Sequence, residues 1–355
     1  MITQTFSSNI RRKEMEAVLT CMVNETVGPG DMNKRLISQA KEFFHVEGAV
    51  AVRSPGIALK FALDCLAMEK GSKIAISPLA PMWHLSTVIE YGLEPVFVDV
   101  DPQSGVISRE ELQKAAADGL SAVILYAPFG GVSDSFDVVN SGLVAIEDIS
   151  ESCGAFFYKN LNEDGSYEEK IMAGGVCPYT IVGLEDRDSL TAGGGALLLA
   201  RSRRDSAPLR SRAEEAPLTD ILPDINCALG FVQLREFSKN QEVCKKIETV
   251  FAESLLSTNH TRLQQVPLQE ARNAEKSVYS FPVVINGSMQ SLTEFTKKKE
   301  IQVATAFENR IIAKMELPEC KNARALYLRT ALFPLYFRLS EKDIEKISKT
   351  LQFLP

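Results

Sequence analysis

Short runs of β-branched residues alternate with helical patterns between Gly48 and Ile146. The expected strands are GAVAV (48–52), KIAI (73–76), PVFVDV (95–100), SAVILYA (121–127) and GLVAIED (142–148). The segments between them, 56–69, 82–92 and 108–117, carry apolar residues at spacings of three and four, which is typical of helices that bury one face. Strands that alternate with such helices indicate βαβ units with right-handed crossovers. This stretch therefore predicts an α/β domain with a mostly parallel sheet and helices on both faces.

The segments on either side of this block have other patterns. Residues 11–23 and 34–44 are expected to form two helices that wrap the large domain. A polar, arginine-rich stretch at 201–212 is expected to be a solvated loop, and residues 224–256 form a helical pattern long enough to bridge two domains. The last third fits a small α+β domain. We therefore divide the chain into residues 1–220, the N-terminal helices and large domain, and residues 221–355, the bridging helix and small domain.

Composition excludes several classes of partner. The 355 residues are 45% hydrophobic, enough for a large core, and the net charge of −7 argues against binding to nucleic acid or anionic membranes. The N-terminus lacks the apolar core of a signal peptide, and no run of about 18 apolar residues could span a bilayer. A reducing cytoplasm is the expected location. The seven cysteines and three histidines show no metal-ligand spacing, so no metal site is expected.

Two stretches carry the candidate chemistry. The first, LVAIEDISESCGAFF (143–157), is an apolar run that ends in Glu147 and Asp148 and then in small residues. An acid at the end of a parallel strand can hold a ligand, or it can merely cap the following turn. The second, YTIVGLEDRDSLTAGGGALLLA (179–200), contains a glycine run before an apolar strand. Because the glycines precede the strand, they indicate a tight turn instead of a dinucleotide-binding loop.

Five segments together resemble the DegT/StrS family of sugar-nucleotide aminotransferases. They are EPVFVDVD (94–101), VAIEDISESCGA (144–155), SLTAGGGALLLA (189–200), LPDINCALGFVQL (222–234) and NARALYLRTALFPLY (322–336). The resemblance implies the PLP-transferase fold type I, named for pyridoxal phosphate (PLP), with a large, mostly parallel sheet domain and a smaller C-terminal α+β domain. It also implies a homodimer, and a place among proteins that make amino sugars for surface polysaccharides or glycosylated products.

The resemblance assigns roles to several positions of a PLP site. Asp148 matches the aspartate that pairs with the pyridine nitrogen and keeps it protonated. Where the family has a serine-glycine-threonine turn that holds the cofactor phosphate, this chain has Ser54, Pro55 and Gly56. Proline has no amide hydrogen to donate, although a helix N-terminus at this place could still attract an anion. Phosphate binding is therefore expected to be weakened.

The aromatic and polar positions around the ring also depart from the family. The aromatic residue that stacks on the pyridine ring falls on Pro81, and Trp83, two residues later, could replace it or be a core residue. The family's glutamine and histidine correspond to Glu151 and Cys153. A glutamate here would add negative charge beside an already anionic cofactor.

The position of the Schiff-base lysine is the most consequential departure. The alignment through SLTAGGGA places Asp188 at this position and Gly183 at the position of a phosphate-binding serine. No lysine lies between Lys170 and Lys239, so a small shift in the alignment cannot restore an internal aldimine. Some relatives carry a histidine there and run dehydration chemistry, but an aspartate beside a phosphate would be repelled by it.

Three further features of the sequence bear on the site. The family's asparagine that reaches the phosphate from the partner subunit aligns near Thr219. The arginines of the stretch 201–212 could meet a sugar-nucleotide diphosphate, but a solvated face is the simpler interpretation. His84 is expected to lie on a helix surface or in the core instead of acting as a catalyst.

Three hypotheses for function remain open. In the first, the chain is a homologue that has lost transamination and binds a sugar-nucleotide-like ligand, or pairs with an active paralogue. In the second, PLP or pyridoxamine phosphate (PMP) binds without a covalent link over Asp148, and Asp188 or Glu151 acts as the acid/base. In the third, the chain is a purely structural subunit, as a homodimer or as a heterodimer with the paralogue.

Overall fold

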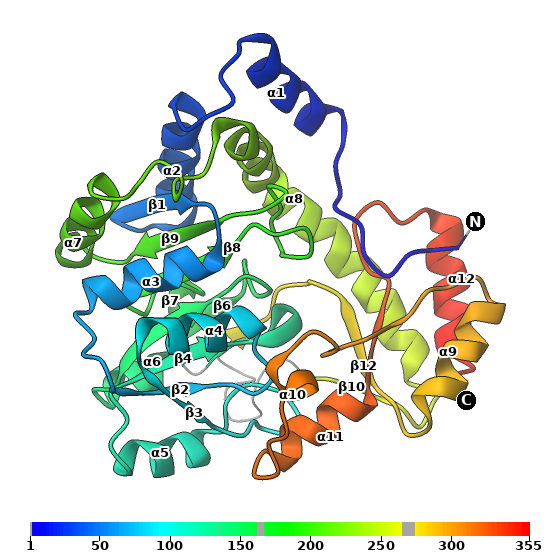
Figure 1. Ribbon diagram of the computed structural model, residues 1–355. Helices are drawn as coiled ribbons and strands as arrows, with labels where there is room; N and C mark the ends of the chain where they lie inside the picture. Colours follow the sequence, from blue (N-terminus) through cyan, green and yellow to red (C-terminus); the bar gives the residue numbers. More distant parts are fainter. Residues whose placement is uncertain (1, 134, 162–166, 265–273) are drawn as a thin grey trace.

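The apolar strands of the first half assemble into a seven-stranded sheet in the order β1-β9-β8-β5-β4-β2-β3 (Figure 1). The computed structural model describes residues 2–133, 135–161, 167–264 and 274–355. Strand β9 runs antiparallel to β1 and β8, and the other four pairings are parallel. The strands are β1 (Gly48–Val52), β2 (Lys73–Ile76), β3 (Glu94–Phe97), β4 (Ala122–Tyr126), β5 (Val144–Asp148), β8 (Tyr179–Gly183) and β9 (Ala196–Ala200).

Helices cover both faces of this sheet, as the sequence predicts. In β1, Val50 and Val52 belong to one hydrophobic cluster and Ala51 to another, because successive side chains of a strand point to opposite faces. The helices of this part are α1 (Arg12–Val23), α2 (Asp31–Phe44), α3 (Pro55–Cys65), α4 (Met82–Tyr91), α5 (Arg109–Ala117), α6 (Ser135–Asn140) and α7 (Arg203–Glu214), with the 3₁₀ turn η1 (Pro128–Gly130). The expected α/β class with a mostly parallel sheet is confirmed.

A long helix, α8 (Asp224–Leu255), runs from the large sheet to the C-terminal part of the chain (Figure 1). It contacts α1 and α2 near one end and α12 near the other. The C-terminal part contains a four-stranded sheet in the order β10-β12-β14-β13 with its own core around Phe251, Phe281 and Phe333. Its elements are β10 (Thr261–Arg262), β12 (Phe281–Val284), α9 (Met289–Lys298), β13 (Ala304–Thr305), α10 (Ile311–Lys314), α11 (Lys321–Arg329), β14 (Thr330–Phe333) and α12 (Glu341–Leu351).

Two local features differ from the sequence-based expectation. The arginine-rich stretch is not a loop, because residues 203–214 form α7, whose start is fixed by a capping box between Ser202 and Asp205. This helix was not predicted because its composition is polar and Leu209 is its one buried residue. A small sheet in the order β11-β6-β7, made of β6 (Phe156–Leu161), β7 (Tyr167–Met172) and β11 (Ala274–Glu275), was not expected either. The division of the chain at residue 220 stays a prediction.

Candidate active site

The acids expected at the end of β5 lie on opposite faces of the sheet. Glu147 accepts hydrogen bonds from the Ser133 hydroxyl at 2.8 Å and from the Gly174 amide at 2.9 Å, on the far side from Asp148. Burial raises the pKa of the Glu147 carboxyl. Glu147 is therefore a buried structural acid, and Asp148 alone belongs to the candidate site.

Asp148 is fully buried, and both of its oxygens already have partners in the protein. The Oδ2 atom lies 2.7 Å from Nε2 of His84, whose side chain is also fully buried. The Oδ1 atom accepts hydrogen bonds from the Ser150 amide, at 3.0 Å, and from the Ser150 hydroxyl. The resemblance assigns the Asp148 carboxylate to a pyridine nitrogen. In this chain the carboxylate is instead paired with the imidazole of His84.

His84 reaches Asp148 from the first turn of α4. Its ring is edge-on to the Trp83 ring, with centroids 4.1 Å apart, and to the Tyr126 ring at 5.9 Å. The other ring nitrogen, Nδ1, is buried and has no hydrogen-bond partner among the described residues. The sequence left open whether His84 lies on a helix surface or in the core; it lies in the core, and its contact with Asp148 was not predicted. The available signal was helical spacing, which places His84 in one buried stripe with Leu85 and Val88.

Glu151 is held by three partners, none of which was predicted from the sequence. Its carboxylate accepts a hydrogen bond from the Tyr126 hydroxyl at 2.7 Å and one from the Phe129 amide at 3.2 Å. It also forms a buried ion pair with Arg310, which lies just before α10 in the C-terminal part. The extra negative charge expected from Glu151 is therefore neutralised within the chain.

Asp188 and Gly183 depend on each other sterically. The Asp188 Oδ2 atom accepts a hydrogen bond from the Glu185 amide at 2.8 Å, and the Gly183 amide donates to the Ser150 hydroxyl at 2.8 Å. A Cβ atom at position 183 would lie only 2.1 Å from Asp188 Oδ2 and 2.7 Å from Ser150 Oγ. Any larger residue at position 183 would therefore force the side chains of Asp188 and Ser150 to move.

The residues expected to hold a phosphate lie at the start of α3. The Ser54 hydroxyl accepts a hydrogen bond from the Ile57 amide at 3.2 Å, so it serves as the N-cap of this helix. Pro55 is the first helical residue, a position where the missing amide hydrogen costs the helix nothing. Thr219 lies exposed in the turn before β-bridge residue Ile221. Neither Ser54, Gly56 nor Thr219 lines the cleft described next.

A cleft of about 220 Å³ remains beside Asp188 and Trp83. Acidic side chains outnumber basic ones in its wall, and one of the two arginines, Arg310, is committed to Glu151. Trp83 and Tyr279 supply aromatic surface, which suits a sugar ring. The charged residues of the wall are Glu151, Glu185, Arg187, Asp188, Glu308 and Arg310. The arginines of α7 do not line this cleft.

Comparison with known proteins identifies the family. Residues 8–169 and 218–352 match the model of the DegT/DnrJ/EryC1/StrS aminotransferase family. The chain belongs to this family. It is 22% identical to the spore coat polysaccharide biosynthesis protein SpsC of Bacillus subtilis, over 97% of this chain and 94% of SpsC. DegT/DnrJ/EryC1/StrS proteins are sugar aminotransferases and dehydratases of nucleotide-sugar and polysaccharide biosynthesis.

Solved structures of the family share the fold. The PLP form of the putative sugar aminotransferase Spr1654 from Streptococcus pneumoniae aligns with a TM-score of 0.84 at 15% identity, covering 97% of this chain and 96% of that one. The GDP-4-keto-6-deoxy-D-mannose-3-dehydratase of E. coli, solved with bound hydrated PLP, aligns with a TM-score of 0.82 at 18% identity, covering 99% and 100%. These likenesses confirm the PLP-transferase fold type I.

No group of three metal-binding side chains occurs among residues 2–133, 135–161, 167–264 and 274–355. Within the same ranges, no helix has the length and hydrophobicity needed to cross a membrane. All seven cysteines are free thiols, and six of them are buried.

Gly183→Ala should lower the free energy of unfolding by about 1–3 kcal/mol, because the added methyl overlaps Asp188 and Ser150. Urea denaturation measures the change. In an Asp188→Ala background the closest atom is gone, so the same substitution should cost less than half as much. An equal cost in both backgrounds would show that the two positions are not coupled.

Asp188→Asn should flatten the dependence of stability on pH. Burial raises the pKa of the Asp188 carboxyl well above its ordinary value, and the carboxylates of Asp148 and Glu151 raise it further. The native state therefore binds this proton more tightly than the unfolded chain does. Its stabilising contribution is complete below the unfolded pKa of about 4 and is lost as pH rises through the native pKa.

Denaturation midpoints between pH 4 and pH 8 test this expectation. The decline in unfolding free energy with rising pH should be smaller in Asp188→Asn than in the native protein. Asp186→Asn, an exposed change in the same loop, serves as the control and should leave the slope unaltered. Identical slopes for all three proteins would contradict the role given to Asp188.

Proposed function

We propose that this chain is a non-transaminating member of its family that binds a sugar-nucleotide-like ligand within nucleotide-sugar or polysaccharide biosynthesis. One observation carries the proposal: the His84 imidazole lies 2.7 Å from Asp148 Oδ2, with both side chains fully buried. Asp148 Oδ2, the atom that would hold a cofactor ring, is therefore already paired with His84. The cleft beside Trp83 and Asp188 remains available for a small polar ligand.

The residues present do not fit PLP in the pose of the family. The ring anchor is occupied by His84, the lysine position holds Asp188, and a serine at position 183 would overlap that aspartate. The Ser54 hydroxyl caps α3. If each lost charge-assisted hydrogen bond is worth about 1.5–3 kcal/mol, several such losses amount to decades of affinity. No catalytic step is therefore derived through this cofactor.

Spectroscopic titration tests the proposal. PLP or PMP added to the purified protein should produce neither a bound-cofactor absorbance band nor a rise in melting temperature. Borohydride reduction in the presence of PLP should leave no modified lysine near Asp148. A stoichiometric band that survives gel filtration would overturn the proposal.

A repaired variant provides the matched comparison. Asp188→Lys combined with Gly183→Ser restores the two family residues and takes away the aspartate oxygen that a Cβ at position 183 would meet at 2.1 Å. With His84 still in place, we expect at most weak and unstable aldimine absorbance near the new lysine. Adding His84→Asn should strengthen that absorbance, because it shortens the side chain that occupies Asp148. Equal absorbance with and without this third change would remove His84 from the explanation.

The competing function keeps catalysis with PLP or PMP bound without a covalent link. The raised pKa of Asp188 favours it, because a carboxyl that holds its proton to a higher pH than usual is better suited to act as a general acid. In this competing function, the Asp148 carboxylate must release the His84 imidazole and pair with the pyridine nitrogen instead. The titration above separates the two functions, since only this one predicts a saturable cofactor band.

We further propose that the chain acts as a dimer, either with itself or with an active paralogue. Four apolar side chains on α1, at spacings typical of one helix face, are between 56% and 72% exposed. They are Met15, Leu19, Met22 and Val23. A surface of this kind is typical of a helix that packs against a partner.

Leu19→Glu should weaken this association and shift the mass measured by light scattering towards the monomer. Leu256→Glu replaces an even more exposed leucine, at the C-terminal end of α8, and should leave the mass unchanged. A monomeric native protein would contradict self-association. Co-purification with an active family member would then support the heterodimer.

A further inference from the structure

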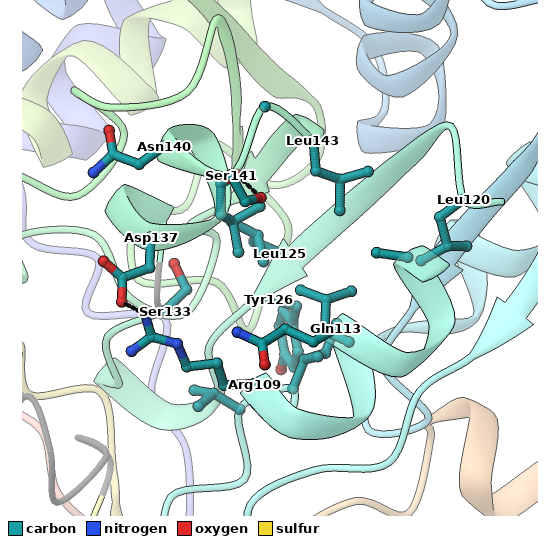
Figure 2. Close-up of a pocket in the computed structure, with 16 residues that line it drawn as sticks. Arg109, Gln113, Leu120, Leu125, Tyr126, Ser133, Asp137, Asn140, Ser141 and Leu143 are labelled. Carbon is teal, nitrogen blue, oxygen red and sulfur yellow. Dashed lines mark hydrogen bonds and ion pairs between the residues drawn. The ribbon is translucent and has the colours of Figure 1, made fainter. Parts of the chain in front are cut away.

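A second cavity lies between α5 and α6 (Figure 2); its lining includes Tyr126, which also contacts Glu151, but no residue that lines the cleft beside Asp188. Its volume is about 580 Å³, more than twice that of the cleft beside Asp188. Its base is apolar and includes Leu125 of β4, Leu112 of α5 and Val138 of α6. Pockets that bind small molecules commonly have volumes of about 300–1,000 Å³.

The cavity exists because α6 is too short to cover its part of the sheet. With six residues, α6 is about 9 Å long, whereas the five residues of β4 extend about 17 Å. The helices α3, α4 and α5 have nine to eleven residues. Leu120 and Leu143, at the open end, consequently stay half-buried. The pocket is open to solvent, so the apolar side chains at its open end are only partly covered by the protein.

The rim of the cavity is polar but balanced in charge. Arg109 of α5 and Asp137 of α6 form an ion pair across its mouth, as Figure 2 shows. The other polar groups of the rim are neutral: the side chains of Gln113, Asn140 and Ser141. A ligand that fits this lining has an apolar body and a neutral end that can form hydrogen bonds, since a charged group would have to compete with the existing ion pair.

We propose that this cavity, the α5–α6 pocket, is a binding site for a neutral, largely apolar small molecule. The apolar body would contact Leu112, Leu125 and Val138, and the polar end would lie at the rim near Gln113 and Asn140. This site is separate from the cleft beside Asp188, and the inference does not depend on the proposed function.

Two fluorescent probes that share one ring system test the inference. N-phenyl-1-naphthylamine is neutral, and 1-anilinonaphthalene-8-sulfonate is its anionic counterpart. The neutral probe should bind the native protein with saturable, one-to-one enhancement of fluorescence, at least about tenfold more tightly than the sulfonate. Absence of saturable binding, or tighter binding of the sulfonate, would overturn the proposal.

A matched pair of variants locates the probe. Ala116→Trp adds a large side chain to the lining of the pocket, whereas Ala117→Trp adds the same side chain to an exposed position of α5 outside the lining. We expect Ala116→Trp to weaken the neutral probe at least about tenfold and Ala117→Trp to leave its affinity unchanged. Circular dichroism and melting temperature show that both variants fold. Equal affinities for the two folded variants would place the probe elsewhere and refute the assignment.

Discussion

Replacing His84 by alanine should lower the free energy of unfolding by about 3–5 kcal/mol, the largest effect that we expect for one substitution. The change leaves the Asp148 carboxylate buried without its partner at 2.7 Å, and such an uncompensated group is costly in the protein interior. It also opens a cavity between Trp83 and Tyr126. Urea or guanidinium denaturation measures the loss.

Controls separate the lost contact from a disturbed helix. Ser86→Ala changes an exposed residue of the same helix and should alter stability by less than about 0.5 kcal/mol. Imidazole added to His84→Ala should restore part of the lost stability, because it can occupy the vacated place and pair with Asp148. A loss in unfolding free energy below about 1 kcal/mol for His84→Ala would show that His84 does not hold Asp148. The Asp148 carboxylate would then be available to a cofactor ring.

Replacing Arg310 by methionine should cost about 3 kcal/mol, because it strands the buried Glu151 carboxylate. Methionine retains much of the apolar bulk of the arginine stem, so the loss reports mainly on the missing charge. Arg187→Met, at an exposed arginine of the same cleft, is the matched control and should have little effect on stability.

A double variant tests the cause of this loss. Glu151→Gln introduces the residue that the family carries and removes the charge that Arg310 neutralises. Combined with Arg310→Met, it should recover at least half of the stability lost in the single variant, because no buried charge is then left unpaired. Additive losses in the double variant would show that the two side chains do not act as a pair.

Much of the fold could be predicted from short stretches of sequence. Runs such as VAIED and AVILY are apolar and β-branched, and they alternate with helical patterns, so their pairing into a parallel sheet follows from local propensity and periodicity. The missing lysine is likewise a property of the sequence alone. Helix α7 was missed because its helical signal depends on a capping box and a single buried leucine, amid residues that also favour loops.

The contacts that define the candidate site were much less accessible to sequence reasoning. His84 and Asp148 are 64 positions apart, and Glu151 and Arg310 are 159 positions apart. No periodic pattern links such pairs, because a pattern reports only on the nearest turns of a helix or the neighbouring residues of a strand. The short α6 was not anticipated as the origin of a cavity for the same reason.

The sequence by itself determined the α/β architecture, the acid at the end of β5 and the absence of any lysine between Lys170 and Lys239, the stretch that aligns with the family's Schiff-base lysine. These follow from residue type and local spacing. Only the tertiary structure decided that Asp148 is occupied by His84, that Arg310 neutralises Glu151 and that Gly183 makes room for Asp188. The physical reason is that buried charges and close contacts are satisfied by whichever side chains the folded chain brings together, however distant they are in sequence.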